Sequence, residues 1–220
     1  MSKNKPTHKP EARSDMHFAI VASRYNSKHV DFLLSRVQKK LRENRVPANA
    51  ISVTRVPGAN EIPYVANMLA LTGEYDCIIA LGVVIAGETP HHSIIAHATA
   101  GAIQDVAIET QIPVINGIIV TDNEAQADER VFGETDRGSE FALAALDVAV
   151  TGARLAKYLE ELDLNDIQRE RDAEIFGDKF LLSDDDDDEH DSSRRRDDDD
   201  DDDDGGDDYL SGGNSPFHKN

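Results

Sequence analysis

Short apolar runs alternate regularly with longer segments of helical periodicity, and this alternation is what most constrains the fold. The run 76–85 is apolar almost throughout, which is typical of a parallel strand covered on both faces. The sequence predicts strands at 17–23, 50–56, 76–85 and 113–121. It predicts helices at 28–44, 60–73, 90–110, 123–131 and 138–162. This order predicts an α/β domain in which helices cover both faces of a four-stranded parallel sheet.

Charge divides the chain into three predicted parts. Residues 1–15 are polar and are expected to form a flexible arm, and residues 16–163 form a mildly acidic domain. Residues 164–220 hold 22 acidic and 7 basic residues and few apolar ones, so we expect a disordered Asp-rich tail. A solvated, solubilising tail is the first interpretation, and a tail that recruits a basic partner or cations is the alternative.

The bulk composition excludes several classes of partner. The net charge of −20 argues against nucleic acid, because phosphates would be repelled. No window is long and apolar enough to span a membrane, and the basic N-terminus lacks the apolar segment of a signal peptide. The single cysteine, Cys77, cannot form an internal disulfide and is expected to be a buried small hydrophobe. These features favour a cytoplasmic protein.

Polar and glycine-rich motifs fall at or near the predicted ends of the strands. They are SRYN (23–26), PGANE (57–61), AGETPHH (86–92) and INGIIVTD (115–122). In open α/β sheets, ligands bind in the crevice beyond the carboxyl ends of the strands. The sequence therefore predicts a ligand site at this edge of the sheet.

The third motif also predicts the start of a helix. Thr89 suits the N-cap and Pro90 the first helical position, which places His91 and His92 in the first turn. Free N–H groups and the helix dipole make such a start an anion site, and they disfavour a cationic imidazole that could then accept a proton near neutral pH. Acid–base work on a phosphorylated substrate is the interpretation. At most one of the two histidines is expected to face the crevice, a metal site is disfavoured, and His97 is expected to be structural.

The motifs together carry a family resemblance. SRYN, VPGANEIP, YDCIIALGVVIAGETPHH, TQIPVINGIIVTD, QADER and RGSEFALAALDVA occur in order between residues 16 and 160. They closely resemble 6,7-dimethyl-8-ribityllumazine synthase. The resemblance implies a flavodoxin-like three-layer α/β/α sandwich that forms homopentamers, often assembled into icosahedral shells, with active sites at subunit interfaces. It implies a transferase of riboflavin biosynthesis that needs no metal or other cofactor and takes two small-molecule substrates.

The resemblance also assigns roles to residues of this chain. His91 corresponds to the acid–base histidine, and Arg130, supplied by the neighbouring subunit, to the phosphate-binding arginine. The residues expected around the phosphate are Glu88, Thr89, Arg130 and Arg137. Those expected around the pyrimidine ring and ribityl chain are Tyr25, Asn26, Ala59, Asn60, Glu61, Val84, Ile85 and Asn116.

Some positions depart from the family pattern. Asn60 and Asn116 stand where relatives often carry aromatic residues, Arg137 stands where a lysine is usual, and the segment 130–138 is one residue shorter than usual. These changes and the acidic tail motivate an alternative, a non-catalytic paralogue that binds flavin or lumazine or forms a container for basic cargo. A generic flavodoxin-like binding module is a third interpretation, which does not account for the pairing of His91 with Arg130.

Overall fold

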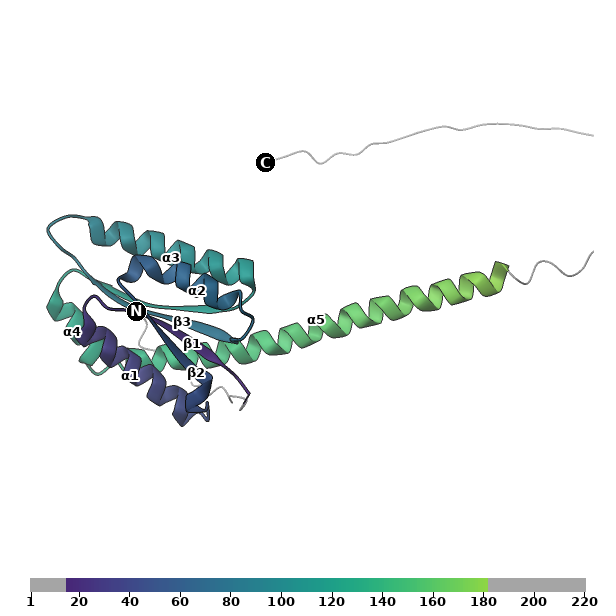
Figure 1. The fold of residues 1–220 in the computed structure, drawn as a ribbon, viewed down its shortest axis with the longest axis horizontal. Coiled ribbons are helices and arrows are strands. Elements are labelled where there is room, and N and C mark those ends of the chain that lie inside the picture. Colours follow the sequence, from purple (N-terminus) through teal and green to yellow (C-terminus); the bar gives the residue numbers. More distant parts are fainter. Residues whose placement is uncertain (1–14, 182–220) are drawn as a thin grey trace, which may run out of the picture. The chain divides into compact units, whose positions relative to one another are not determined.

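A four-stranded parallel sheet forms the centre of the protein (Figure 1). The computed structural model describes residues 15–181, with side chains described up to Ala173. The strands are β1 (Phe18–Ser23), β2 (Ile51–Val56), β3 (Cys77–Ile85) and β4 (Val114–Thr121). Their order across the sheet is β2-β1-β3-β4. The predicted four-stranded parallel sheet is confirmed, and each strand begins within one residue of its expected start.

Helices cover both faces of this sheet, so the predicted three-layer arrangement is confirmed as well. One face packs against α1 (Ser27–Glu43), α4 (Glu124–Phe132) and the first turns of α5 (Arg137–Leu181). The other packs against α2 (Ile62–Ala70) and α3 (His91–Thr110), and 3₁₀ turns at Ala48–Ala50 and Ala59–Glu61 flank β2.

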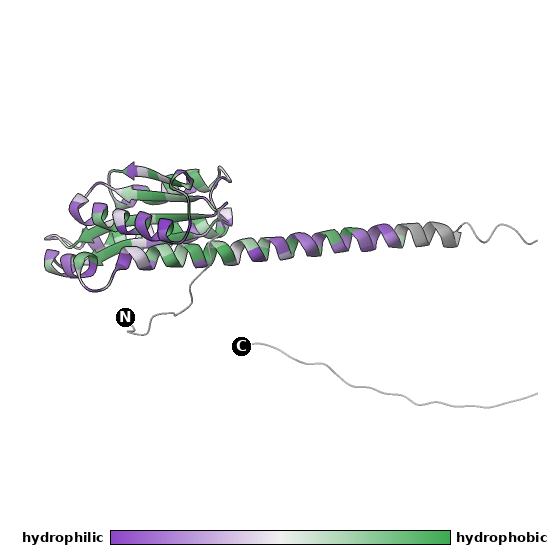
Figure 2. Ribbon diagram, turned by 90° about the horizontal axis from the view of Figure 1, so that it is seen from below, coloured by the Kyte–Doolittle hydropathy of each residue, from purple (hydrophilic) through white to green (hydrophobic). Residues whose placement is uncertain are grey.

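The strands are apolar because both of their faces are covered. Successive side chains of β1 point to opposite faces, so Phe18 and Ile20 enter the core beneath α1 while Ala19 and Val21 enter the core beneath α2 and α3. Figure 2 shows the same pattern as apolar strands between helices whose outer surfaces are more polar. Cys77 is fully buried at the start of β3, as expected of a small hydrophobe, and burial raises the pKa of its thiol.

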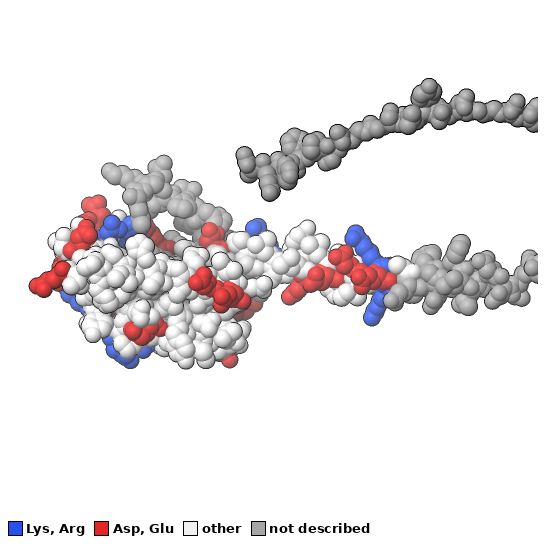
Figure 3. Space-filling model, turned by 90° about the horizontal axis from the view of Figure 1, so that it is seen from above, with Lys and Arg blue, Asp and Glu red and all other residues white. Residues whose placement is uncertain are grey.

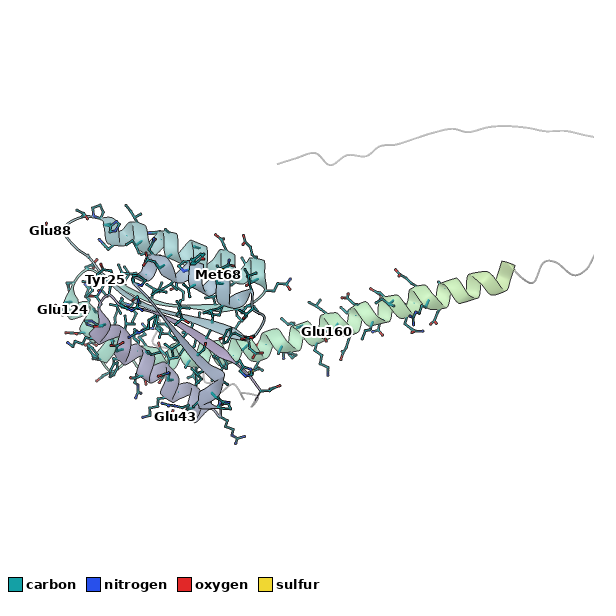
Figure 4. The ribbon with its side chains drawn as sticks, viewed as in Figure 1. Tyr25, Glu43, Met68, Glu88, Glu124 and Glu160 are labelled. Carbon is teal, nitrogen blue, oxygen red and sulfur yellow. The ribbon has the colours of Figure 1, made fainter. Side chains whose placement is uncertain are left out.

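The strand order also places the crevice. The chain passes from β1 to β2 on one side of the sheet and from β3 to β4 on the other, so the direction of winding changes between β1 and β3. Loops that leave neighbouring strands in opposite directions open a crevice at their carboxyl ends. Figure 4 shows Tyr25, Glu88 and Glu124 at this end of the sheet, each following a different strand.

The last helix is longer than the sequence predicts. We expected a helix over 138–162 and disorder from residue 164, but α5 continues to Leu181, so residues 164–181 are helical. Up to Ala173, where the description of side chains ends, Ala149 is the last buried apolar residue of α5, and pairs such as Lys157–Glu161, one turn apart, support the exposed part. Residues 1–14 of the predicted arm and residues 182–220 of the predicted tail lie outside the described residues.

The contacts within the chain divide it into two units, and the boundary along the sequence falls between Glu170 and Arg171. Residues 15–170 belong to the first unit and contain the sheet, and residues 171–181 are the described part of the second. No helix within residues 15–181 combines the length and the apolar character needed to cross a membrane.

Candidate functional site

A cavity of about 560 Å³ lies at the carboxyl ends of β1, β2 and β3. Its walls come from the loop after β1, the turn after β2, the end of β3 and the first two turns of α3. The lining residues are Tyr25, Asn26, Gly58, Ala59, Asn60, Glu61, Val83, Val84, Ile85, Gly87, Thr89, His91, His92, Ile94, Ile95 and Ala98. The structure therefore brings together nine of the sequence-predicted residues, from four separate segments of the chain.

The loop after β1 supplies an aromatic ring and an amide. The backbone N–H groups of Arg24 and Tyr25 both donate to Pro57 O, at 3.1 Å, which ties this loop to the turn after β2. Tyr25 is 73% exposed, so one face of its ring is available to a flat ligand. Asn26 has a positive φ of 52°, and its Nδ2 donates to the Val83 carbonyl oxygen at 2.7 Å. This bond holds the loop against β3 and leaves the amide oxygen as an acceptor group.

The turn after β2 supplies a carboxylate. The N–H of Gly58 donates to Glu61 Oε2 at 2.7 Å, which closes the turn. A Cβ at position 58 would lie 3.1 Å from this oxygen and 3.4 Å from the Tyr25 ring, so glycine allows the close approach. A carboxylate has two oxygens, so Glu61 can hold the turn and still accept hydrogen bonds from a ligand hydroxyl. Ala59 is buried beside it and Asn60 is exposed.

The start of α3 corrects two of our predictions. The N-cap is Pro90, not Thr89, and the helix begins at His91; the N–H groups of Ser93 and Ile94 donate to Pro90 O. Thr89 still lines the cavity, but it makes no capping hydrogen bond. Both histidines line the cavity, although we expected at most one to face it. His91 and His92 are the first two residues of α3, and the cavity is wide enough at its rim for both to line it.

The environments of the three α3 histidines differ. His92 Nδ1 lies 3.3 Å from Thr89 O, and its Nε2 lies 3.3 Å from Ser93 Oγ, so protein groups occupy both ring nitrogens. His97 bonds to Ser93 O at 2.7 Å and is not among the lining residues, in line with the structural role we expected. His91 is exposed at the cavity and is the first residue of the helix, so its own N–H precedes the first helical hydrogen bonds, which Ser93 and Ile94 donate to Pro90 O. It is the imidazole best placed to exchange a proton with a bound ligand.

Four predicted residues lie outside the cavity. Glu88 is exposed in the loop between β3 and α3, where its neighbours Gly87 and Thr89 line the cavity. Asn116 is exposed on the edge strand β4, where its Oδ1 accepts from Ile118 N at 3.1 Å. Arg130 and Arg137 line a separate hollow of about 260 Å³ beside Thr135. Arg137 also pairs with Glu140 at 2.8 Å.

α3 contributes an apolar wall of the cavity that we did not predict from the sequence. Ile94, Ile95 and Ala98 follow His91 at intervals of three, four and seven residues, which places them on one face of a helix. This spacing could have predicted the wall once His91 was taken as a cavity residue. Gly58 and Gly87 lie in two of the predicted motifs, but the sequence assigned them no role of their own, because a residue that contributes backbone alone has no distinctive side-chain chemistry.

The charge of the cavity limits what one chain can bind. Among the described residues that line it there is a carboxylate, two imidazoles and two side-chain amides, but no lysine or arginine. Within residues 15–173, no cluster of three or more His, Cys, Asp or Glu side chains could hold a metal ion. Fold and cavity together define an α/β protein that binds a small, flat, polar molecule beyond the carboxyl ends of a parallel sheet.

Comparison with known proteins identifies the family. The family model of 6,7-dimethyl-8-ribityllumazine synthase matches residues 15–152. The chain is 41% identical over 132 residues to the 6,7-dimethyl-8-ribityllumazine synthase of Xanthomonas oryzae pv. oryzae (strain PXO99A) and 42% identical to that of Xylella fastidiosa (strain M12). Each match covers 60% of this chain and 86% of the relative. The chain belongs to the 6,7-dimethyl-8-ribityllumazine synthase family.

Proposed function

We propose that this chain condenses 5-amino-6-(D-ribitylamino)uracil with 3,4-dihydroxy-2-butanone 4-phosphate. The products are 6,7-dimethyl-8-ribityllumazine, phosphate and water, and the reaction is a step of riboflavin biosynthesis. The observation that carries the proposal is that His91, Glu61, Tyr25 and Asn26 line one cavity in a chain whose residues 15–152 match this family. The location proposed is the cytoplasm, which rests on the single cysteine and is tested by cell fractionation.

The cavity suits the pyrimidine substrate. The exposed ring of Tyr25 can stack on the flat ring, and Asn26 and the backbone of β3 at Val84 and Ile85 offer hydrogen bonds to its edge. Glu61 can accept hydrogen bonds from ribityl hydroxyls. Asn60 adds polarity where relatives often stack a ring, so this pocket relies more on hydrogen bonding.

The phosphate needs a positive charge that the cavity of one chain lacks. First-turn N–H groups at His91 supply part of the anion site. We assign the rest to Arg130, and with it Arg137, from a neighbouring copy, because both line a hollow apart from this chain's own cavity. Asn116, also away from that cavity, would reach the pyrimidine from the same neighbour. His91 then moves protons between the amine, the ketone and the leaving phosphate.

An apolar outer surface supports such an assembly. Figure 3 shows the surface over α2 and α3 as largely uncharged. Exposed apolar side chains on these two helices are Tyr64, Met68, Ile94 and Ile108, and Leu71 is exposed directly after α2. Apolar patches of this kind mark contacts between proteins. We propose a homopentamer, alone or as part of a larger shell, and native mass spectrometry measures the number of subunits.

Turnover of the purified protein tests the function. Mixing the two substrates and following the fluorescent lumazine product gives the rate above the uncatalysed background. His91→Ala should lower kcat substantially, toward a loss of about 10²-fold, which is typical when an acid–base group is removed. His97→Ala is the matched control, because it removes an exposed imidazole from the same helix outside the cavity, and its kcat should stay within about 2-fold.

The two main outcomes separate the two candidate functions. Turnover that falls in His91→Ala but not in His97→Ala supports the enzyme. An intact assembly that binds the lumazine tightly without turnover would support the non-catalytic paralogue, which the polar residues Asn60 and Asn116 favour. Arg130→Ala should raise KM for the butanone phosphate above all, and a change confined to the pyrimidine KM would contradict the phosphate assignment.

A further inference from the structure

A compact cluster joins α1 to α4 outside the cavity, and the function described so far does not use it. His29 Nε2 lies 2.8 Å from Asp128 Oδ1, and Lys28 Nζ lies 3.6 Å from the same oxygen. The ring of Phe132 packs on His29, with 5.2 Å between ring centroids, and meets Phe32 edge-on at 4.9 Å. We call these five residues the α1–α4 cluster.

His29 is buried, and its polarity needs an explanation. Its side chain is 4% exposed, whereas that of Asp128 is 45% exposed. A buried imidazole costs free energy unless a partner satisfies its nitrogens, and Asp128 is the partner at Nε2. An aliphatic side chain would fill this position between two helices without such a cost. The hydrogen-bonded pair therefore fixes the orientation of α4 relative to α1 more closely than apolar packing alone would.

The pair sets the rotation of α4 about its own axis. Ala127 and Val131, four residues apart, are buried in the core. Asp128 and Phe132, also four residues apart, face α1 through the cluster. Residues two apart on a helix point about 200° apart, so Arg130 lies on the side opposite Asp128 and is exposed. A rotation of α4 about its own axis that moves Asp128 away from His29 therefore moves Arg130 by a comparable distance in the opposite direction.

We propose that His29 and Asp128 are positioning residues that set the direction of the Arg130 guanidinium toward the phosphate bound in the neighbouring copy. This inference rests on the proposed function and deepens it. α4 is nine residues long and follows the edge strand; its buried residues are Ala127 and Val131, and the cluster joins it to α1. A phosphate-binding guanidinium loses much of its effect when it is displaced by about 1 Å, because its hydrogen bonds are directional.

The test compares Asp128→Ala with Asp128→Asn in the assembled protein. Asp128→Ala removes the partner of His29, and KM for the butanone phosphate should rise by about 10-fold. KM for the pyrimidine should change by less than about 2-fold, since Asp128 is not among the residues that line the cavity. Asp128→Asn keeps an oxygen that can accept from His29 Nε2, and it should restore most of the wild-type KM. Asp31→Ala is the matched control, because it removes a carboxylate of α1 that pairs with Arg55 of β2 and not with a residue of α4.

A double-mutant cycle with Arg130→Ala makes the inference falsifiable. If Asp128 acts through Arg130, Asp128→Ala should cause no further rise in KM once Arg130 is gone. An equal rise in both backgrounds, or an equal change in both KM values, would mean a purely structural role and would overturn the inference. If Asp128→Ala does not fold, His29→Gln takes its place in the same cycle. Failure of the proposed function would instead appear in the wild type, as absent turnover or as an Arg130→Ala variant with an unchanged KM for the butanone phosphate.

Discussion

We predict that replacing glycine by alanine changes the stability of the protein in opposite directions at two positions of α5. Gly138 lies where the first turn of α5 contacts α1. A Cβ there would lie 2.5 Å from Arg36 Cβ and 2.9 Å from the Leu33 carbonyl oxygen. Gly152 lies further along the same helix, and a Cβ there would meet no atom within 4 Å. Neither glycine has a positive φ, so alanine brings no backbone strain at either position.

The magnitudes follow from these distances. Carbon atoms pack at about 3.5–4.0 Å, so Gly138→Ala requires α5 and α1 to separate by roughly 1 Å, and overpacking of this kind costs about 1–3 kcal/mol. The higher helix propensity of alanine offsets about 0.5–1 kcal/mol of this destabilisation. The net expectation is a destabilisation of about 1–2 kcal/mol for Gly138→Ala. Gly152→Ala keeps the propensity gain alone and should be stabilised by about 0.5–1 kcal/mol.

Thermal unfolding measures both effects. For a domain of this size, 1 kcal/mol shifts Tm by about 2–4 °C, so Gly138→Ala should lower Tm by about 2–8 °C and Gly152→Ala should raise it by about 1–4 °C. All proteins are compared at one concentration, because assembly makes Tm depend on concentration. Equal shifts of the same sign would refute the argument that contact with α1, rather than helix propensity, decides the cost at position 138.

Three further predictions concern charge, the thiol and the tail. The Arg36 guanidinium beside Asp136 lowers the pKa of the Asp136 carboxyl, so the ion pair stabilises the protein at pH 5–7 and this stabilisation is lost as the pH falls below about 4. The difference in Tm between the wild type and Asp136→Asn should therefore narrow as the pH falls. A difference that widens would contradict the ion pair. Cys77 is buried with a raised pKa, so its thiol should not react with a disulfide reagent until the protein unfolds, as a time course in native buffer and in denaturant would show. Deleting residues 164–220 should leave turnover unchanged and Tm within about 2 °C, because the described side chains of 164–173 are all exposed. Lower turnover or a larger fall in Tm would show that the segment does more than remain solvated.

Local patterns determined the elements of the fold. The apolar run 76–85 is β3 to within one residue, and the helical spacing in 28–44 is α1 to within one residue at each end. These predictions succeed because a strand covered on both faces and a helix with one buried face leave different periods in the sequence. The C-terminal boundary of α5 was missed for a related reason. The acidic composition from residue 164 on indicated disorder, but over 164–181 helix-forming residues and pairs such as Arg169–Asp166 offset that signal.

The cavity itself was largely predictable, and its chemistry less so. The strand ends placed Tyr25, Glu61 and His91 in one crevice, because the carboxyl ends of parallel strands meet at the same edge. The sequence could not show that His92 also reaches this cavity, because that depends on how the start of α3 packs beside the ends of the strands. It also could not show which side chains of the site are already hydrogen-bonded to other protein groups, as Asn26 Nδ2 is to Val83 O.

The sequence by itself determined the order of strands and helices, the edge of the sheet where a ligand binds, and the residue types available there. Tertiary structure alone decided that Arg130 lies apart from its own cavity, that Gly138 admits the close contact with α1, and that His29 meets Asp128 across 99 residues of chain. The physical reason is range. Periodicity and capping act between residues a few positions apart, whereas these contacts join residues that only the packing of complete helices brings within a few ångströms.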